Sequence, residues 1–510
     1  MPQYVPLVVI YPAGSQFPKS GYDPIADGSS TLIGLSGGDL IVGASRRPVT
    51  PALVEWPTFS RSISVQPRQV RFASLSIRVA NGGSVARSIN LGDWPRMRLF
   101  LCLQDSGYIH SPLPILDARI VNYVLNPAND SLVLDAVEYE QGMGAPFPGG
   151  PMTVADFPSM PAEYSGVVNR QIIIGESNFH IPLIQIDRDG FEYYVAEPPM
   201  QRTPTAVFVS GQRVDPLSYR WDIGVTANGT RYTKLVLSEP ISSLSLGVPG
   251  IVTAYGGKGL NYDSAIRLIA ESQDVSIGGG FVAMLADVGM RFPVASIINK
   301  RANGFELLFE RYMPQTTYAP YFSPTGELEA VNMDFRASSP LTISRSNGII
   351  GLISVEKNPV TEVFNDIQID VGTTFRGQQS RRPLISVVRN AEIGPPEIRS
   401  ILALSRNLYG TRFMQIDAGD LAPEIDGLGR PVSSNAAERL ADFLSITLSF
   451  SNHSYKYVCS YDLALSVVPG QSARIIDESI GLDTIAIIKQ VDYGVQPILT
   501  IEAIEQWKEY

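Results

Sequence analysis

Alternation of apolar and polar residues, which is typical of half-buried strands, recurs along most of this chain. In the first 160 residues it predicts short strands at Thr31 to Ile33, Asp39 to Val42 and Leu75 to Val79. Two longer apolar runs, Ile115 to Val124 and Ser131 to Tyr139, flank a turn-forming segment at 126–130 and predict a β-hairpin.

Between residues 165 and 275 the same pattern continues and ends in a helix. Strands are predicted at Gln171 to Ile174, Ile181 to Ile186, Phe191 to Val195, Ala206 to Val209, Asp222 to Val225 and Tyr232 to Leu237. The Asn228-Gly229 pair favours a primed hairpin turn, which needs positive φ. Tyr262 to Glu271 places apolar residues on one helical face.

Beyond residue 275 three helices interrupt further strands. The helices are predicted at Phe281 to Val288, after a Gly278-Gly279-Gly280 breaker, and at Pro396 to Leu408 and Ala436 to Ile446. The predicted strands are Ser296 to Ile298, Glu306 to Phe309, Leu341 to Ile343, Ile349 to Val355, Asp366 to Val371, Ser454 to Val458, Asp462 to Val467, Ala473 to Ile476, Thr484 to Val491 and Pro497 to Ile501.

These elements predict a mainly β, multidomain protein with α+β parts, because 510 residues exceed what one compact core holds. The stretch Gly142 to Pro151, dense in Gly and Pro, marks a first boundary. We expect four units: a barrel-like β domain at 1–160, a small β-rich domain at 165–275, an α+β domain at 276–375, and a domain with two helices and a β-barrel at 376–510.

Composition narrows the functional classes. The 40 basic and 50 acidic residues give a net charge of −10, which argues against broad DNA or anionic-membrane binding. Three histidines and two cysteines exclude most histidine- or thiolate-rich metal sites and a disulfide scaffold. The run Met1 to Ile10 is short and contains Pro6, so we expect a first strand rather than a signal peptide, synthesis in the cytosol and no membrane insertion.

Three local motifs partly match known catalytic or binding motifs but fit turns better. Gly34 to Gly38 matches the G-x-S-x-G elbow, yet a strand pattern follows where that elbow needs a helix. Asp187, Asp189 and Gly190 lack the remaining calcium-loop ligands, and Tyr255 to Gly259 lacks the phosphate-loop spacing. We therefore assign no catalytic, metal or cofactor-binding residue and expect no cofactor. A glycosidase-type pair among the acidic residues stays open.

Four stretches follow one another along the chain. They are Ile181 to Tyr194 with Ala206 to Val214; Asp263 to Asp274 with Met284 to Ser296 and Phe305 to Arg311; Ser400 to Gly410, a helix ending at Tyr-Gly; and Glu438 to Leu444 with Leu465 to Asp477, a helix, a strand and a Pro-Gly turn before a strand. Together they resemble the tail-hub (baseplate-hub or tail-tip) proteins of tailed bacteriophages and related gene transfer agents. The resemblance covers roughly residues 165–510 in the order of that family.

The resemblance implies a structural, non-enzymatic hub at the virion tail tip, assembled in the host cytoplasm. It implies a homotrimeric ring that closes the tail tube and contacts the distal tail and tail tube proteins, tail fibre or spike proteins and the tape measure protein. DNA would pass through its channel only transiently. If so, we expect acidic side chains to outnumber basic ones along the channel wall.

Two loops are the candidates for partner contacts, since connecting loops often carry binding. They are 142–151 and 314–326, and their candidate residues are Gly142, Gly144, Pro146, Phe147, Pro148, Tyr318, Tyr321 and Phe322. Plain domain linkers are an equal interpretation. Two other functional classes stay open: a tailspike-like polysaccharide depolymerase, for which the sequence offers no repeats, and a secreted adhesin, for which it offers no export signal.

Overall fold

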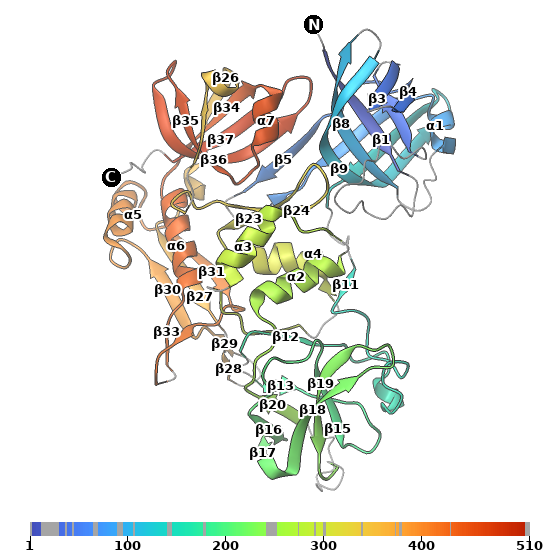
Figure 1. Ribbon diagram of the computed structural model, residues 1–510. Coiled ribbons are helices and arrows are strands. Elements are labelled where there is room, and N and C mark those ends of the chain that lie inside the picture. The colour runs from blue at the N-terminus through green and yellow to red at the C-terminus, as the bar shows by residue number, and fades with distance from the viewer. Residues whose placement is uncertain are drawn as a thin grey trace.

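The computed structural model describes residues 3–11, 30–35, 38–42, 45–64, 70–88, 95–105, 108–139, 145–176, 180–240, 252–273, 275–289, 292–298, 302–337, 340–372, 374–376, 380–428 and 430–504. The protein is mainly β, with several sheets and a few short helices, as the sequence predicts. Two strand-rich lobes lie at the top of Figure 1, a helical region lies in the middle, and a smaller strand-rich lobe lies below.

The N-terminal lobe holds a ring of paired strands. β9 pairs with β3 and also with β8, so that β9, β3, β4, β2, β1 and β8 close on themselves. Alternate residues of β1, among them Val5, Leu7 and Val9, are buried inside this ring, whereas Val8 and Ile10 join the core on its other side. The elements are β1 (Gln3–Ile10), β2 (Thr31–Gly34), β3 (Gly38–Val42), β4 (Ser45–Pro51), β5 (Phe59–Ile63), β6 (Val70–Arg71), β7 (Ser74–Ala80), α1 (Gly82–Ser88), β8 (Arg96–Asp105), β9 (Tyr108–Asn126), β10 (Ser131–Val137) and β11 (Pro146–Phe147).

One sheet joins the N-terminal and C-terminal lobes. β5 pairs with β36 (Leu482–Tyr493), with Ser62 opposite Gln490 and Phe59 opposite Tyr493. The resulting 16-stranded sheet includes the path β26-β34-β37-β36-β5-β7-β10-β9, and β5 lies between the two upper lobes in Figure 1. One hydrophobic core under it contains residues from both lobes, such as Leu75 and Tyr457. The first and last expected units therefore share a sheet and a core.

The lower lobe contains two four-stranded sheets, ordered β13-β20-β16-β17 and β14-β15-β19-β18. Each apolar face packs into small cores around Tyr194 and Val207. The elements of the lobe are β13 (His180–Pro182), β14 (Ile184–Gln185), β15 (Glu192–Ala196), β16 (Ala206–Val209), β17 (Gln212–Arg213), β18 (Tyr219–Val225), β19 (Arg231–Leu237) and β20 (Val252–Tyr255). β12 (Ile172–Ile174) precedes them, and α2 (Tyr262–Ser272), which packs in the middle region, follows them.

The middle region packs its helices around a second large core, which includes Ile266, Phe281, Tyr312 and Phe443. Its elements are α3 (Gly279–Gly289), β21 (Ser296–Ile298), β22 (Ala302–Asn303), α4 (Gly304–Glu306), β23 (Tyr318–Phe322), β24 (Leu328–Asn332), β27 (Asp366–Val371), β28 (Thr374–Arg376), β29 (Ser380–Arg382), β30 (Ile385–Arg389), α5 (Pro396–Tyr409), β31 (Phe413–Ala418), β32 (Glu424–Ile425), β33 (Pro431–Ser433) and α6 (Asn435–Leu448). The C-terminal lobe adds β25 (Leu341–Ser344), β26 (Ile349–Lys357), β34 (His453–Cys459), α7 (Tyr461–Ser466), β35 (Ser472–Asp477), β36 and β37 (Ile498–Ala503).

Two predicted strands are wrong, because both segments are helical. Glu306 to Phe309 lies in α4 and the π-helical turn Leu307–Tyr312 that follows it, after Asn303 caps Phe305 N–H at 2.9 Å. Asp462 to Val467 lies mostly in α7, where Ser460 Oγ accepts from Leu463 N–H at 3.2 Å. In each case a capping side chain starts a helix whose few apolar residues fit either period.

Two further local predictions need correction. Asn228-Gly229 does not form a primed turn: only Gly229 has positive φ, +84°, after a turn in which Gly229 N–H donates to Thr226 O. The glycine breaker before α3 lies partly inside that helix, which begins at Gly279. Glu329 Oε2 accepts from the N–H groups of Gly280 and Phe281 and so replaces the cap that the sequence lacks.

Both cysteines are buried free thiols, and burial raises the pKa of each to about 12. At pH 8 about one thiol in ten thousand is then ionised, and the thiolate is the reactive form. We expect Cys102 and Cys459 to resist a chromogenic disulfide reagent at pH 8 in the native protein and to react fully in denaturant. Rapid labelling of the native protein would contradict this burial.

Candidate interaction surface

A hydroxyl-rich face covers the strands that join the two upper lobes. The registers place Ser60 and Ser62 of β5 on the same side of the sheet as Ser74 and Ser76 of β7, opposite the buried Phe59 and Leu75. Across the neighbouring strands the same side carries Gln490, Thr500, Ser454, Asp135 and Asn122. These side chains are exposed or half-buried. We call this surface the joined-sheet face.

Charges of both signs lie on the joined-sheet face. Its basic residues are Arg71, Arg78, Arg119, Lys456 and Lys489, and its acidic residues are Asp135, Glu356, Asp492 and the buried Glu502. Local bonds hold several of them: Asn122 Nδ2 donates to Asp135 Oδ2 at 3.0 Å, and Gln490 Nε2 donates to Asp492 Oδ1 at 2.6 Å. The face is mostly polar, with Val124 and Val133 beside Asn122 and Arg78, and its five basic residues slightly outnumber its four acidic ones.

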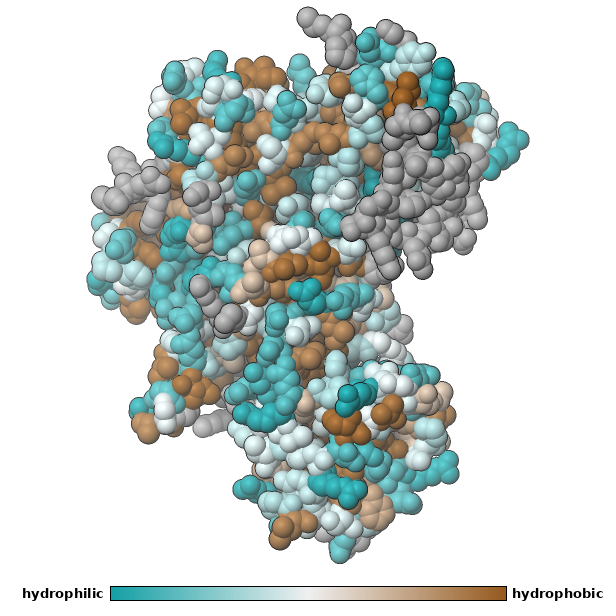
Figure 2. Space-filling view, viewed as in Figure 1, coloured by the Kyte–Doolittle hydropathy of each residue, from teal (hydrophilic) through white to brown (hydrophobic). Residues whose placement is uncertain are grey.

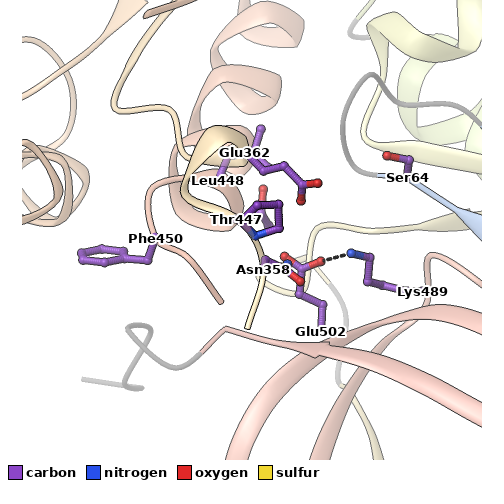
Figure 3. Close-up of a pocket in the computed structure, with 9 residues that line it drawn as sticks. Ser64, Asn358, Glu362, Thr447, Leu448, Phe450, Lys489 and Glu502 are labelled. Carbon is purple, nitrogen blue, oxygen red and sulfur yellow. Dashed lines mark ion pairs between the residues drawn. The ribbon is translucent and has the colours of Figure 1, made fainter. Parts of the chain in front are cut away.

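A shallow hollow of about 340 Å³, partly open solvent, lies at the border of this face (Figure 3). The end of α6 and the segment 358–362 meet β36 and β37 there. Its lining is Ser64, Asn358, Pro359, Glu362, Thr447, Leu448, Phe450, Lys489 and Glu502.

Polar groups of the hollow bind one another. Lys489 Nζ lies 2.8 Å from Glu502 Oε2, and Asn452 Nδ2 donates to Glu502 Oε1 at 3.3 Å. The Thr447 hydroxyl donates to the Phe443 carbonyl at 2.9 Å, so it is held by the backbone of its own helix rather than by a base. The hollow therefore joins two parts of the fold and does not present Thr447 as a nucleophile.

Elsewhere among the described residues, candidate catalytic and metal-binding groups are also few. His110, His180 and His453 lie on β9, β13 and β34, which belong to the N-terminal, lower and C-terminal lobes. Within the described ranges no cluster of His, Cys, Asp or Glu is placed to hold a metal ion. Among the helices described, none has both the length and the apolar character to cross a membrane.

Buried ion pairs fix the sheet to its surroundings. Arg61 of β5 pairs with Glu138, and the side chains are 6% and 1% exposed. Glu138 also accepts from Ala73 N–H at 2.8 Å. Loss of hydration raises the pKa of Glu138, and the attraction of Arg61 only partly offsets it. Arg98 pairs with Asp117 and donates to the Thr325 carbonyl at 3.1 Å, which ties β8 to the turn between β23 and β24.

The predicted contact loops are more structured than the sequence suggests. The segment 314–326 is not a loop: Tyr318, Tyr321 and Phe322 belong to β23, which pairs with β24. Phe322 is buried in the core, and Tyr318 donates its hydroxyl to Asp287 Oδ2 at 2.9 Å.

In the other segment, Phe147 is buried in β11, Pro148 is half-buried and Pro146 is exposed. Gly142 and Gly144 lie outside the described residues. Contact with partners through any of these residues remains a prediction.

Sequence reasoning missed the joined-sheet face, although a signal was present. Serine alternates with buried residues in Phe59–Ile63 and again in Ser74–Ala80.

Figure 2 shows a second exposed feature, apolar surface in the middle of the molecule over α3, which turns Val282, Ala283 and Ala286 outward.

No protein-family model matches the chain, and no curated protein does. Among solved structures it is similar to the 43 kDa tail protein of prophage MuSo2 from Shewanella oneidensis, with 8% identity and a TM-score of 0.36 over 92% of this chain and 99% of that one. A tail protein from Neisseria meningitidis has 10% identity and a TM-score of 0.36 over 90% and 94%. Prophage tail protein gp18 from Listeria monocytogenes has 9% identity and a TM-score of 0.33 over 97% and 94%. All three are described as tail proteins.

Proposed function

We propose that this chain is a structural hub of a bacteriophage tail, and that copies of it form a homotrimeric ring around a passage. The observation that carries the proposal is the sheet that joins the two upper lobes. A ring wall needs an extended surface that continues across the subunit, and the path from β26 to β9 supplies one.

In this proposal the joined-sheet face is the wall of the passage. Serine, threonine, asparagine and glutamine side chains make up most of this surface, and its acidic residues nearly balance its basic ones, so phosphates find little excess of Lys or Arg to bind. The sequence predicted an acidic wall, whereas the wall that we propose is nearly neutral. Such a surface lets DNA pass without holding it.

The remaining surfaces would contact neighbours in the tail. The distal tail and tail tube proteins, the tape measure protein, and fibre or spike proteins are the partners that a hub at the tail tip would bind. The lower lobe, which extends away from the joined sheet in Figure 1, is suited to contacts outside the ring. No catalytic step is part of this function.

The test is the mass of the native assembly. Native mass spectrometry of the full chain should show a species of three subunits, and a reconstruction of the virion should show threefold density at the tail tip. A stable monomer that is absent from purified particles would refute the proposal. Release of reducing sugar from host capsule would instead favour the depolymerase alternative.

A further inference from the structure

We propose that the ring is built by strand pairing between copies, with β26 of one copy adding to the free end of β9 of the next. This inference rests on the ring proposed above and names its interface. Two strand edges at opposite ends of one sheet, which have no neighbour among the described strands, carry it.

The first edge is β26. Among the described strands it pairs with β34 alone and ends the sheet. Ile350, Ile353 and Val355 on it are 63%, 48% and 45% exposed. Its register against β34 shifts between Ile349 and Gly351 and between Leu352 and Ser354. Apart from these irregular positions, the apolar edge offers unpaired N–H and C=O groups to another strand.

The second edge is the last part of β9. β8 accompanies β9 only as far as the pair Arg96 and Arg119, so within the described residues the segment 121–126 pairs with β10 alone. Its residues Tyr123, Val124 and Leu125 are 48%, 53% and 41% exposed. This segment therefore ends the same sheet on the opposite side.

The exposed apolar stretch of each edge carries no charge, although β26 ends in the exposed Glu356 and Lys357. Residues 350–355 of β26 and 121–126 of β9 contain no Asp, Glu, Lys or Arg. By contrast β18, the edge strand of the lower lobe, exposes Arg220 and Asp222. Charge on a free edge hinders association, so its absence from these two stretches leaves them able to pair.

The strand directions fit as well. Every neighbouring pair along β26-β34-β37-β36-β5-β7-β10-β9 is antiparallel, so β26 and β9 run in opposite directions. When β26 of the next copy follows β9, the alternation continues without a break. Contacts between opposite ends of a subunit are head-to-tail, and such contacts form a ring when the rotation between successive copies closes.

Cysteine cross-linking tests this directly, because both native thiols are buried. One tagged chain carries Val355→Cys, and a differently tagged chain carries Tyr123→Cys. After mixing and reassembly, a short thiol cross-linker should join the two tags. Cross-linking only within the Val355→Cys chains would show β26 pairing with itself and would overturn the proposal, as would the absence of any product in a mixture that has formed rings.

Charged variants test the strand pairing separately from the proposal that the protein forms a ring. Ile353→Lys with Val355→Lys should abolish the three-subunit species and leave a folded monomer, since apposed edges cannot bury these charges. The matched control is Ile223→Lys with Val225→Lys on β18, which should keep the ring. A β26 variant that still forms the threefold ring refutes the strand pairing but not the hub function. If the wild-type protein forms no ring, both fail.

Discussion

Replacing Arg61 with methionine is expected to lower the free energy of unfolding by about 3–5 kcal/mol, the usual cost of leaving a buried charge without its partner. Glu138 would keep only the Ala73 N–H as a donor among its described bonds. Without Arg61, the pKa of the Glu138 carboxyl in the folded protein rises further above its value of about 4.3 in the unfolded chain. The folded state binds the proton more tightly, so the destabilisation should be small at low pH and should grow as pH rises above that value. Urea unfolding at several pH values measures it.

The double variant Arg61→Met with Glu138→Gln should recover most of the loss, because the amide oxygen still accepts from Ala73 N–H and no charge is buried. The matched control is Arg474→Met, which breaks an ion pair at 2.8 Å whose side chains are 49% and 52% exposed. It should cost at most about 1 kcal/mol. If the Arg61 and Arg474 variants lose the same stability, burial of the Arg61–Glu138 pair is not what matters.

Gly175→Ala is expected to be comparably damaging, for a steric reason. Gly175 has φ +74°, and a Cβ there would lie 1.2 Å from the Val294 carbonyl oxygen. The site follows β12, where that strand pairs with β21 and Gly175 N–H donates to Leu260 O at 2.7 Å. The methyl group would force β12 and β21 apart, at a cost above about 3 kcal/mol when strain and overpacking add.

Gly229→Ala provides the control, because Gly229 has φ +84° but nothing within 4 Å of its Cβ position. This variant should lose only the free energy that a non-glycine residue costs at positive φ, about 1–2 kcal/mol. Limited proteolysis should release the lower lobe from the Gly175 variant and not from the Gly229 variant. If both variants resist the protease equally, the backbone at Val294 can move to accommodate the methyl group without loss of stability.

The strands that could be predicted from the sequence are those in which apolar and polar residues alternate within the strand itself. β7 alternates exposed and buried residues throughout, and the hairpin of β9 and β10 has a turn sequence between two apolar runs. The segments at 306–309 and 462–467 were too short for the period to decide. Ser460 was a visible capping residue that favours a helix at the second of them.

The interaction surface was harder to predict, because it depends on pairing between distant strands. Nothing local in Phe59–Ile63 indicates β36 as its neighbour, so the continuity of the sheet is invisible in the sequence. The same holds for the segment 314–326, whose Pro and Gly content suggested a loop. Its β23 strand is fixed by pairing with β24 and by burial of Phe322.

The pairing of β5 with β36 also bears on the order of folding. β5 ends at Ile63, whereas β36 begins at Leu482, so the two strands meet only after nearly all of the chain between them has been synthesised. Contacts of such large sequence separation form late and slowly. The joined sheet therefore cannot form before β36 has been synthesised, so a chain that stops short of Leu482 would lack the wall that we propose.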